Sequence, residues 1–217
     1  SQKNDKVTDL SSKIDGELSY MTATEDKVVI SLKDNSVYLY DPSNDEIKKQ
    51  SATLNYNGRL SSYYNNLYVL DPPSNQIWKI ALDEDGYKEN TPYISDESLS
   101  IADTTDLAID GSIYSISEGC NINRISRGKS ISNFTVSLPA EESLDSCYGI
   151  YTHEDSNSLM LIGKSSETTR IVELRKNGTF VNQHISKDIN CDAQCTIDPI
   201  NNVFYQTEGD KLKSFKL

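Results

Sequence analysis

The sequence predicts an all-β protein that forms a five-bladed β-propeller. A unit of about 40 to 45 residues with four short strands recurs five times, and this period is typical of propeller blades. Turns also recur at equivalent positions, since Asp85-Gly86 and Asn177-Gly178 both fall between the third and fourth strands of their units. Apolar residues come in short strand-like runs such as Val37–Tyr40, whereas helical repeats need amphipathic stretches of about 10 residues or more.

The best-preserved unit contains the strand-forming runs Leu67–Leu70 and Gln76–Ile80, which are separated by the polar turn Asp71–Asn75. Four other segments align with this unit, so we expect the whole chain, residues 1–217, to be one propeller domain. The predicted blades lie near residues 17–50, 59–90, 104–137, 147–186 and 194–217.

The two ends of the chain are expected to complete one blade together. The fifth unit stops after its third strand, whereas residues 6–10 have no place in the first unit. We therefore expect residues 6–10 to form the outer strand of the last blade, because this closes the ring and removes an exposed sheet edge. The alternative is a six-bladed or truncated ring.

The composition is acidic, with 33 Asp and Glu residues against 21 Lys and Arg residues and a formal net charge of −12. A field of this sign repels phosphate backbones, so we expect no nucleic-acid partner. No apolar run reaches the roughly 20 residues needed to span a bilayer, so we expect no direct membrane insertion of this segment. The chain begins with neither Met nor the apolar core of a signal peptide, so we expect it to be a domain of a larger anchored protein.

The four cysteines predict two disulfides rather than a zinc site, because no C-x2-C pair is present. Cys120 and Cys147 are expected on the same face of the propeller, and Cys191 and Cys195 could close a local loop, so we predict the pairs Cys120–Cys147 and Cys191–Cys195. Such bonds indicate an extracytoplasmic or cell-surface location. Reduced, buried thiols in a cytosolic protein are the alternative.

Parts of the sequence resemble known propellers. The stretch Asn75-Gln76-Ile77-Trp78-Lys79 is similar to the repeat of NHL-type domains. Residues 106–114, together with Arg127-Gly128-Lys129, resemble poorly characterised bacterial propeller regions attached to phosphatase-like or membrane-anchored proteins. The resemblance covers about residues 60–215 of the chain. It implies a binding or sensor module, and it carries over no catalytic residue. The bacterial propeller regions are the closer of these two resemblances and imply six blades, so a ring of five blades would differ from them.

The expected function is therefore non-catalytic binding of a protein or a small ligand. In a propeller, the loops between the second and third strands and the connectors between blades emerge on one face, which we call the loop-rich face, and binding residues collect on such loops. The candidate binding residues in these segments are Pro73, Asn75, Tyr93, Glu118 and Asn121.

The alternative function is a carbohydrate-binding or glycoside-hydrolysing propeller. Hydrolysis needs two carboxylates about 5 to 10 Å apart across the channel, and the innermost strands offer Glu17, Asp106 and Asp198. We expect these acids to serve turns or line the channel, and we expect Tyr63 and Tyr64 to pack between blades. A funnel lined by tyrosines and two close carboxylates would favour the carbohydrate alternative.

No cofactor is expected. The acidic loops are compatible with a Ca²⁺ ion, but no D-x-D-x-D-G loop supports one. The run His153-Glu154-Asp155 falls at a hairpin turn, where such residues usually serve the backbone rather than a metal.

Overall fold

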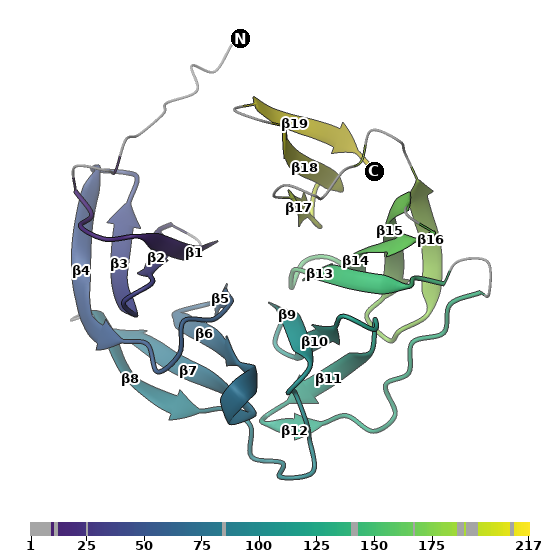
Figure 1. Cartoon of the computed structure of the whole chain (residues 1–217), viewed down its shortest axis with the longest axis horizontal. Coiled ribbons are helices and arrows are strands. Elements are labelled where there is room, and N and C mark those ends of the chain that lie inside the picture. Colours follow the sequence, from purple (N-terminus) through teal and green to yellow (C-terminus); the bar gives the residue numbers. More distant parts are fainter. Residues whose placement is uncertain are drawn as a thin grey trace.

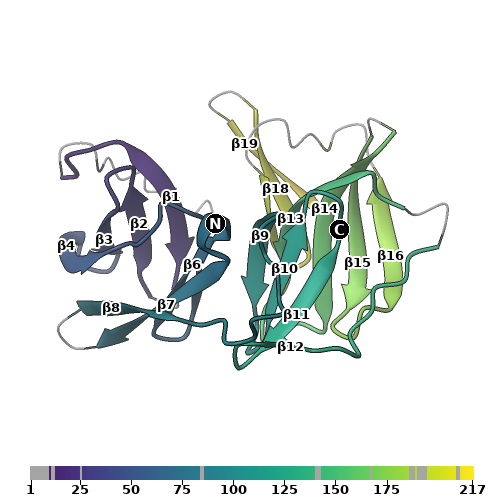
Figure 2. The same ribbon diagram turned by 60° about the horizontal axis from the view of Figure 1, so that its bottom comes forward.

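The computed structural model of the chain describes residues 10, 13–24, 26–83, 86–139, 143–166, 168–185, 189, 195–208 and 211–217. Five small sheets stand around a common centre (Figures 1 and 2), and consecutive strands within each sheet pair in antiparallel fashion. The predicted all-β, five-bladed propeller is confirmed.

The strands follow one another outward from the centre in every blade. Blade 1 consists of β1 (Leu18–Ala23), β2 (Val28–Leu32), β3 (Ser36–Asp41) and β4 (Glu46–Thr53). Blade 2 consists of β5 (Leu60–Tyr63), β6 (Asn66–Asp71), the short 3-10 helix η1 (Pro72–Ser74), β7 (Gln76–Asp83) and β8 (Gly86–Pro92). Blade 3 consists of β9 (Thr104–Ile109), β10 (Ile113–Ser117), β11 (Ile122–Ser126) and β12 (Lys129–Ser130).

Blade 4 consists of β13 (Ser146–Tyr151), β14 (Ser158–Ser165), β15 (Thr168–Arg175) and β16 (Phe180–Ile185). Blade 5 consists, within the described residues, of β17 (Cys195–Asp198), β18 (Val203–Glu208) and β19 (Lys211–Lys216). The predicted closing strand at residues 6–10 lies outside the described residues except for Leu10, which is in no strand and packs against an apolar cluster of blade 1.

Apolar clusters between consecutive blades hold the ring together. In β6, Leu67 and Val69 belong to a cluster with blade 1, whereas Tyr68 and Leu70 belong to a cluster with blade 3. The middle strands are therefore buried on both faces, which explains why they read as continuous apolar runs in the sequence. At about 25 cal/mol per Å² of buried apolar surface, these inter-blade contacts are the main favourable contribution to the fold.

The predicted disulfide Cys120–Cys147 is confirmed. It joins the loop between β10 and β11 to β13 of the next blade, with a Cα–Cα distance of 5.0 Å. Cys195 is also disulfide-bonded, and its predicted partner Cys191 lies outside the described residues. The described residues contain no helix with the length and apolar surface that crossing a bilayer requires.

One buried hydroxyl group gives a test of the packing. Tyr87 on β8 is 1% exposed, and its hydroxyl makes no hydrogen bond within the described part of the chain. Burial raises the pKa of Tyr87 to about 12. We expect Tyr87→Phe to leave the free energy of unfolding unchanged or to raise it by up to about 1 kcal/mol, because it removes an unsatisfied buried group.

Urea unfolding of the two proteins measures this difference. The control is Tyr151→Phe, because the Tyr151 hydroxyl donates to the Cys195 carbonyl oxygen at 3.3 Å and its loss should cost about 1 kcal/mol. A loss of stability in Tyr87→Phe equal to that in Tyr151→Phe would contradict the account.

Candidate functional site

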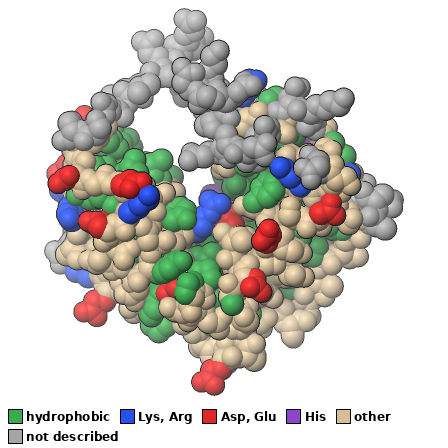
Figure 3. All heavy atoms as spheres, in the orientation of Figure 1, with side chains coloured by type: hydrophobic (Ala, Val, Ile, Leu, Met, Phe, Trp, Pro, Cys, Tyr) green, Lys and Arg blue, Asp and Glu red, His purple; other side chains and the backbone are tan. Residues whose placement is uncertain are grey.

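A cavity of about 660 Å³ lies at the centre of the ring and is visible as a hollow in the space-filling view (Figure 3). Its lining comes from the inner strands β1, β5, β9, β13 and β17 and from the turns that follow them. All five blades therefore contribute side chains to one concave site, and rigid strands fix the position of each.

The backbone of blade 2 places Arg59 at this cavity. Side chains alternate along β5, so Arg59, Ser61 and Tyr63 share one side of the strand, while Leu60 packs on the other side in the cluster between blades 1 and 2. The Arg59 carbonyl oxygen accepts a hydrogen bond from the Leu70 backbone N–H at 3.0 Å, which ties Arg59 to the next strand.

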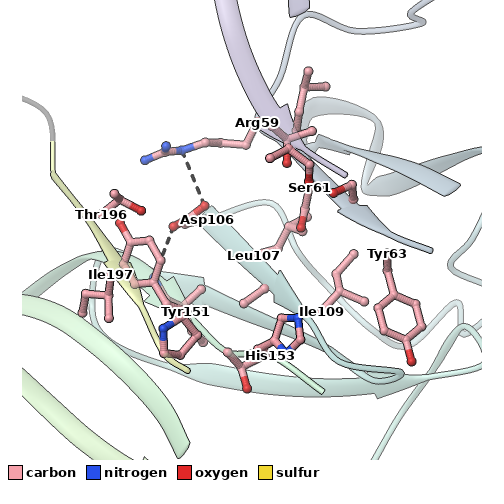
Figure 4. A pocket seen from close by; sticks show the side chains of 18 of the residues that line it. Arg59, Ser61, Tyr63, Asp106, Leu107, Ile109, Tyr151, His153, Thr196 and Ile197 are labelled. Atoms are coloured by element: carbon pink, nitrogen blue, oxygen red, sulfur yellow. Dashed lines mark hydrogen bonds and ion pairs between the residues drawn. The ribbon is translucent and has the colours of Figure 1, made fainter. Parts of the chain in front are cut away.

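An ion pair joins blades 2 and 3 inside the cavity. Arg59 Nε lies 3.5 Å from Asp106 Oδ1 on β9, and Asp106 Oδ2 accepts a hydrogen bond from the Ile150 N–H of blade 4 at 3.2 Å (Figure 4). The Asp106 side chain is 10% exposed, whereas that of Arg59 is 45% exposed. Asp106 is therefore fixed from two sides, and the Arg59 guanidinium remains in contact with the cavity.

Burial dominates the titration of Asp106. Loss of hydration raises the pKa of this carboxyl above its ordinary value of 3.8, although the nearby Arg59 and two backbone N–H groups act in the opposite direction. Burial likewise raises the pKa of Tyr151, whose ring lies beside Asp106 and Thr196 (Figure 4), so its hydroxyl is protonated at neutral pH.

The raised pKa of Asp106 has a measurable consequence. The folded protein holds this proton more tightly than the unfolded chain, so the proton stabilises the fold below pH 3.8 and the stabilisation is lost as the pH rises through the raised pKa. We expect the free energy of unfolding of the wild-type protein to fall, relative to that of Asp106→Asn, as the pH rises from about 4 through the raised pKa in a urea titration.

Asp198→Asn is the control, and its difference from the wild-type protein should stay constant over this range. Hydrogen bonds from Asn201 lower the pKa of Asp198, so its stabilising effect is present above pH 3.8 and is lost as the pH falls. A difference between wild type and Asp106→Asn that stayed constant over this pH range would contradict the burial effect.

The other end of the cavity is aromatic. Tyr63 lies away from the ion pair, beyond Leu107 and Ile109 (Figure 4), and its hydroxyl donates to Glu154 Oε2 at 3.1 Å. Tyr64 contacts the Tyr63 ring edge-on, with centroids 4.5 Å apart, and is 56% exposed. Tyr63 packs against the apolar cluster between blades 2 and 3, as expected, and both Tyr63 and Tyr64 also line the cavity.

The run His153-Glu154-Asp155 occupies the turn after β13, as predicted. The Asp155 backbone N–H donates to His153 Nδ1 at 3.1 Å, and Lys176 Nζ donates to the His153 carbonyl oxygen at 2.7 Å. Within the described residues, no group of three or more His, Cys, Asp or Glu side chains is arranged to hold a metal ion.

The three acids considered for hydrolysis do not come together. Asp106 lines the cavity, whereas Glu17 is exposed and forms an ion pair with Lys33. Asp198 accepts hydrogen bonds from the backbone N–H groups of the turn after β17 and does not line the cavity. Glu154 is the second carboxylate of the lining. The sequence predicts that Glu154 lies in a turn, but no residue pattern indicates that this turn faces the channel.

Of the predicted binding residues on the loop-rich face, three lie around η1. Pro73 is exposed, whereas Asn75 holds the connector between blades 2 and 3, because its Nδ2 donates to the Leu99 carbonyl oxygen at 2.9 Å and its Oδ1 accepts from the Ile101 N–H at 2.7 Å. Tyr93 is half-buried at the start of this connector, packs edge-on against Tyr68 and keeps part of its ring in solvent.

The other two, Glu118 and Asn121, are exposed beside Cys120, and the Glu118 carbonyl oxygen accepts from the Cys147 N–H at 2.9 Å. None of the five predicted binding residues lines the central cavity. Their role in binding stays a prediction. Sequence reasoning missed Arg59 and Tyr151, whose inner-strand position was the only signal that could have singled them out.

The fold is similar to that of several solved structures. One is a structural genomics protein of unknown function from Bacteroides thetaiotaomicron VPI-5482, with a TM-score of 0.58, 11% identity, and coverage of 92% of this chain and 55% of that chain. Another is a chain of the Mitotic Checkpoint Complex, with a TM-score of 0.55, 14% identity, and coverage of 92% and 62%.

A third is PorZ, a bacterial surface component of the type-IX secretion system of Porphyromonas gingivalis, with a TM-score of 0.53, 14% identity, and coverage of 98% of this chain and 29% of that chain. The chain thus spans less than two thirds of the length of each of these three proteins. No model of a known protein family matches the chain, and a search of curated proteins finds no match either. At these identities, the likeness extends to the propeller fold alone.

Proposed function

We propose that this chain is a non-catalytic binding domain whose ligand is a small polar molecule held in the central cavity. The observation that carries the proposal is the cavity itself, which at about 660 Å³ falls within the range of roughly 300 to 1,000 Å³ that is usual for small-molecule sites. Its lining combines apolar side chains with hydroxyl groups, one ion pair and tyrosine rings, which suits a ligand with several polar groups.

The composition of this lining favours the carbohydrate-binding alternative over a site for proteins alone. Three tyrosines, Tyr63, Tyr64 and Tyr151, line the cavity together with the carboxylates of Asp106 and Glu154. Both carboxylates are already engaged, Asp106 by Arg59 and the Ile150 N–H, and Glu154 by the Tyr63 hydroxyl. This engagement supports binding rather than hydrolysis, because a hydrolytic pair must be available to the scissile bond and to water.

A second candidate is a protein-interaction site on the loop-rich face, in keeping with the resemblance to NHL-type binding modules. The Cys120–Cys147 bond and the hydrogen bonds of Asn75 fix the loops of this face while Pro73 stays exposed. Preorganised loops of this kind reduce the entropy cost of binding a partner. The disulfide also supports an extracytoplasmic or cell-surface location.

The proposal is tested by filling the cavity. Ser61 lies on β5 on the same side as Arg59 and faces the cavity (Figure 4), so Ser61→Trp places an indole ring in it. A set of small polar molecules, including neutral sugars, is screened by thermal shift and followed by calorimetry. We expect molecules that bind the wild-type protein to lose binding to Ser61→Trp and to keep it with Ser132→Trp, where the exposed Ser132 lies outside the cavity.

Equal binding to wild type and to Ser61→Trp would overturn the cavity as the binding site. Circular dichroism spectra of both tryptophan variants check that the propeller is retained.

A further inference from the structure

The hydrogen-bond donors of Arg59 are incompletely used within the described residues. Arg59 is the only Lys or Arg among the described residues that line the cavity. Its Nε lies 3.5 Å from Asp106, and its two terminal nitrogens make no hydrogen bond within the described part of the chain. A guanidinium carries five N–H donors, so this side chain presents unused donors towards the cavity.

The geometry of these donors selects a carboxylate. The terminal N–H groups of arginine form a planar fork that matches the two oxygens of a carboxylate or phosphate. A phosphate monoester carries close to two negative charges at neutral pH, and it would lie beside the buried Asp106 in a chain of net charge −12. A carboxylate adds only one negative charge beside the Arg59–Asp106 pair, and its two oxygens can accept from the terminal N–H groups while Nε stays on Asp106.

The other residues that line the cavity suit a ligand whose ring carries hydroxyl groups. Ser61 and Thr196 present aliphatic hydroxyls to the cavity (Figure 4), whereas the Tyr151 hydroxyl in the same region already donates to the Cys195 carbonyl oxygen. At the other end, the rings of Tyr63 and Tyr64 offer apolar faces next to polar groups. Hydroxyls that both donate and accept, together with aromatic faces, are the complement of a sugar ring.

We infer that the central cavity binds a carboxylate-bearing sugar of the uronic acid class, with its carboxylate on the Arg59 fork and its ring against the tyrosines. This inference rests on the proposed function and specifies the ligand of the same cavity. Asp106 is a positioning residue in this arrangement, because it holds Nε of Arg59 and leaves the terminal nitrogens for the ligand.

The test compares two sugars that differ at one carbon. Isothermal titration calorimetry is carried out with glucuronate and with glucose, which share a ring and hydroxyl pattern but differ in the carboxylate. We expect glucuronate to bind the wild-type protein about 10- to 100-fold more tightly than glucose, because a hydrogen bond to a charged group contributes about 1.5 to 3 kcal/mol.

Two double variants test whether the Arg59–Asp106 pair causes the preference for glucuronate over glucose. Arg59→Gln/Asp106→Asn removes both members of the ion pair, so that no unpaired charge stays buried, and we expect it to bind glucuronate and glucose equally. Lys33→Gln/Glu17→Gln removes an exposed ion pair outside the cavity and should keep the preference for glucuronate. Circular dichroism and thermal melting confirm that both variants are folded.

Each other outcome overturns the inference. If wild type binds glucose as tightly as glucuronate, or if the preference survives in Arg59→Gln/Asp106→Asn, Arg59 does not select a carboxylate. If neither sugar binds while other molecules bind in a manner lost in Ser61→Trp, the uronic acid inference fails and the cavity proposal stands. If no molecule depends on Ser61 in this way, both fail.

Discussion

Gly58→Ala is expected to lower the free energy of unfolding by about 3 kcal/mol, because no side chain fits at this position. A Cβ atom built on Gly58 would lie 1.9 Å from the Leu70 carbonyl oxygen and 2.9 Å from Tyr56 Cδ1. The first of these atoms belongs to the backbone of β6, so relief of the clash requires a shift of the segment before β5 against β6. Such a shift also weakens the hydrogen bond from the Leu70 N–H to the Arg59 carbonyl oxygen.

Urea unfolding at neutral pH measures the effect, and Gly119→Ala is the matched control. Gly119 is exposed, and a Cβ there would meet only Asn121 Nδ2 at 3.5 Å, which is an ordinary contact. We expect Gly119→Ala to change the free energy of unfolding by less than about 0.5 kcal/mol. A Gly58→Ala protein as stable as Gly119→Ala would show that Gly58 does not lie in close contact with the Leu70 backbone of β6. Because Gly58 precedes Arg59, Gly58→Ala should also weaken binding of glucuronate.

Removal of the Cys120–Cys147 bond by the double variant Cys120→Ala/Cys147→Ala is expected to lower the free energy of unfolding by about 3 to 4 kcal/mol. The two cysteines are 27 residues apart in sequence, and in the chain-entropy model a loop of this length restricts the unfolded chain by about that amount. Alanine is chosen because Cys147 is buried and a hydroxyl at this position would lack solvent.

The measurement is urea unfolding under non-reducing conditions, which leave the bond of Cys195 intact. Addition of a reductant to the wild-type protein should cause at least as large a loss, since it breaks both bonds. A loss below about 1 kcal/mol in the double variant would indicate that the loop from Cys120 to Cys147 is already restricted in the unfolded chain.

The fold could be predicted because its signals are local and repeated. The period, the turns and the double-sided burial of the middle strands all lie within one unit, and five units give five independent instances of them. The Cys120–Cys147 pair followed from the rule that both segments emerge on one face of a propeller. These inferences need only the order of strands in a blade, which the sequence pattern carries.

The site was less predictable because its contacts join different blades. Asp106 was singled out as an inner-strand acid, but nothing near it in sequence shows that Arg59 of the preceding blade reaches it. Glu17 and Asp198 were equally good candidates in the sequence. In the structure, Glu17 forms an ion pair with Lys33, and Asp198 accepts a hydrogen bond within its own turn. Which side chains of an inner strand face the channel depends on the curvature of the ring, and this is a property of the assembled sheets.

The contacts inside the cavity bear on the cooperativity of unfolding. In open repeat proteins each unit contacts only its neighbours, so units can unfold in succession from one end. Here Asp106 of blade 3 holds Arg59 of blade 2 and the Ile150 N–H of blade 4 at the same time. The Tyr63 hydroxyl of blade 2 also reaches Glu154 of blade 4, which is not its neighbour in the ring. Blades 2, 3 and 4 are therefore coupled through the centre as well as through their shared faces, so we expect them to unfold as one thermodynamic unit.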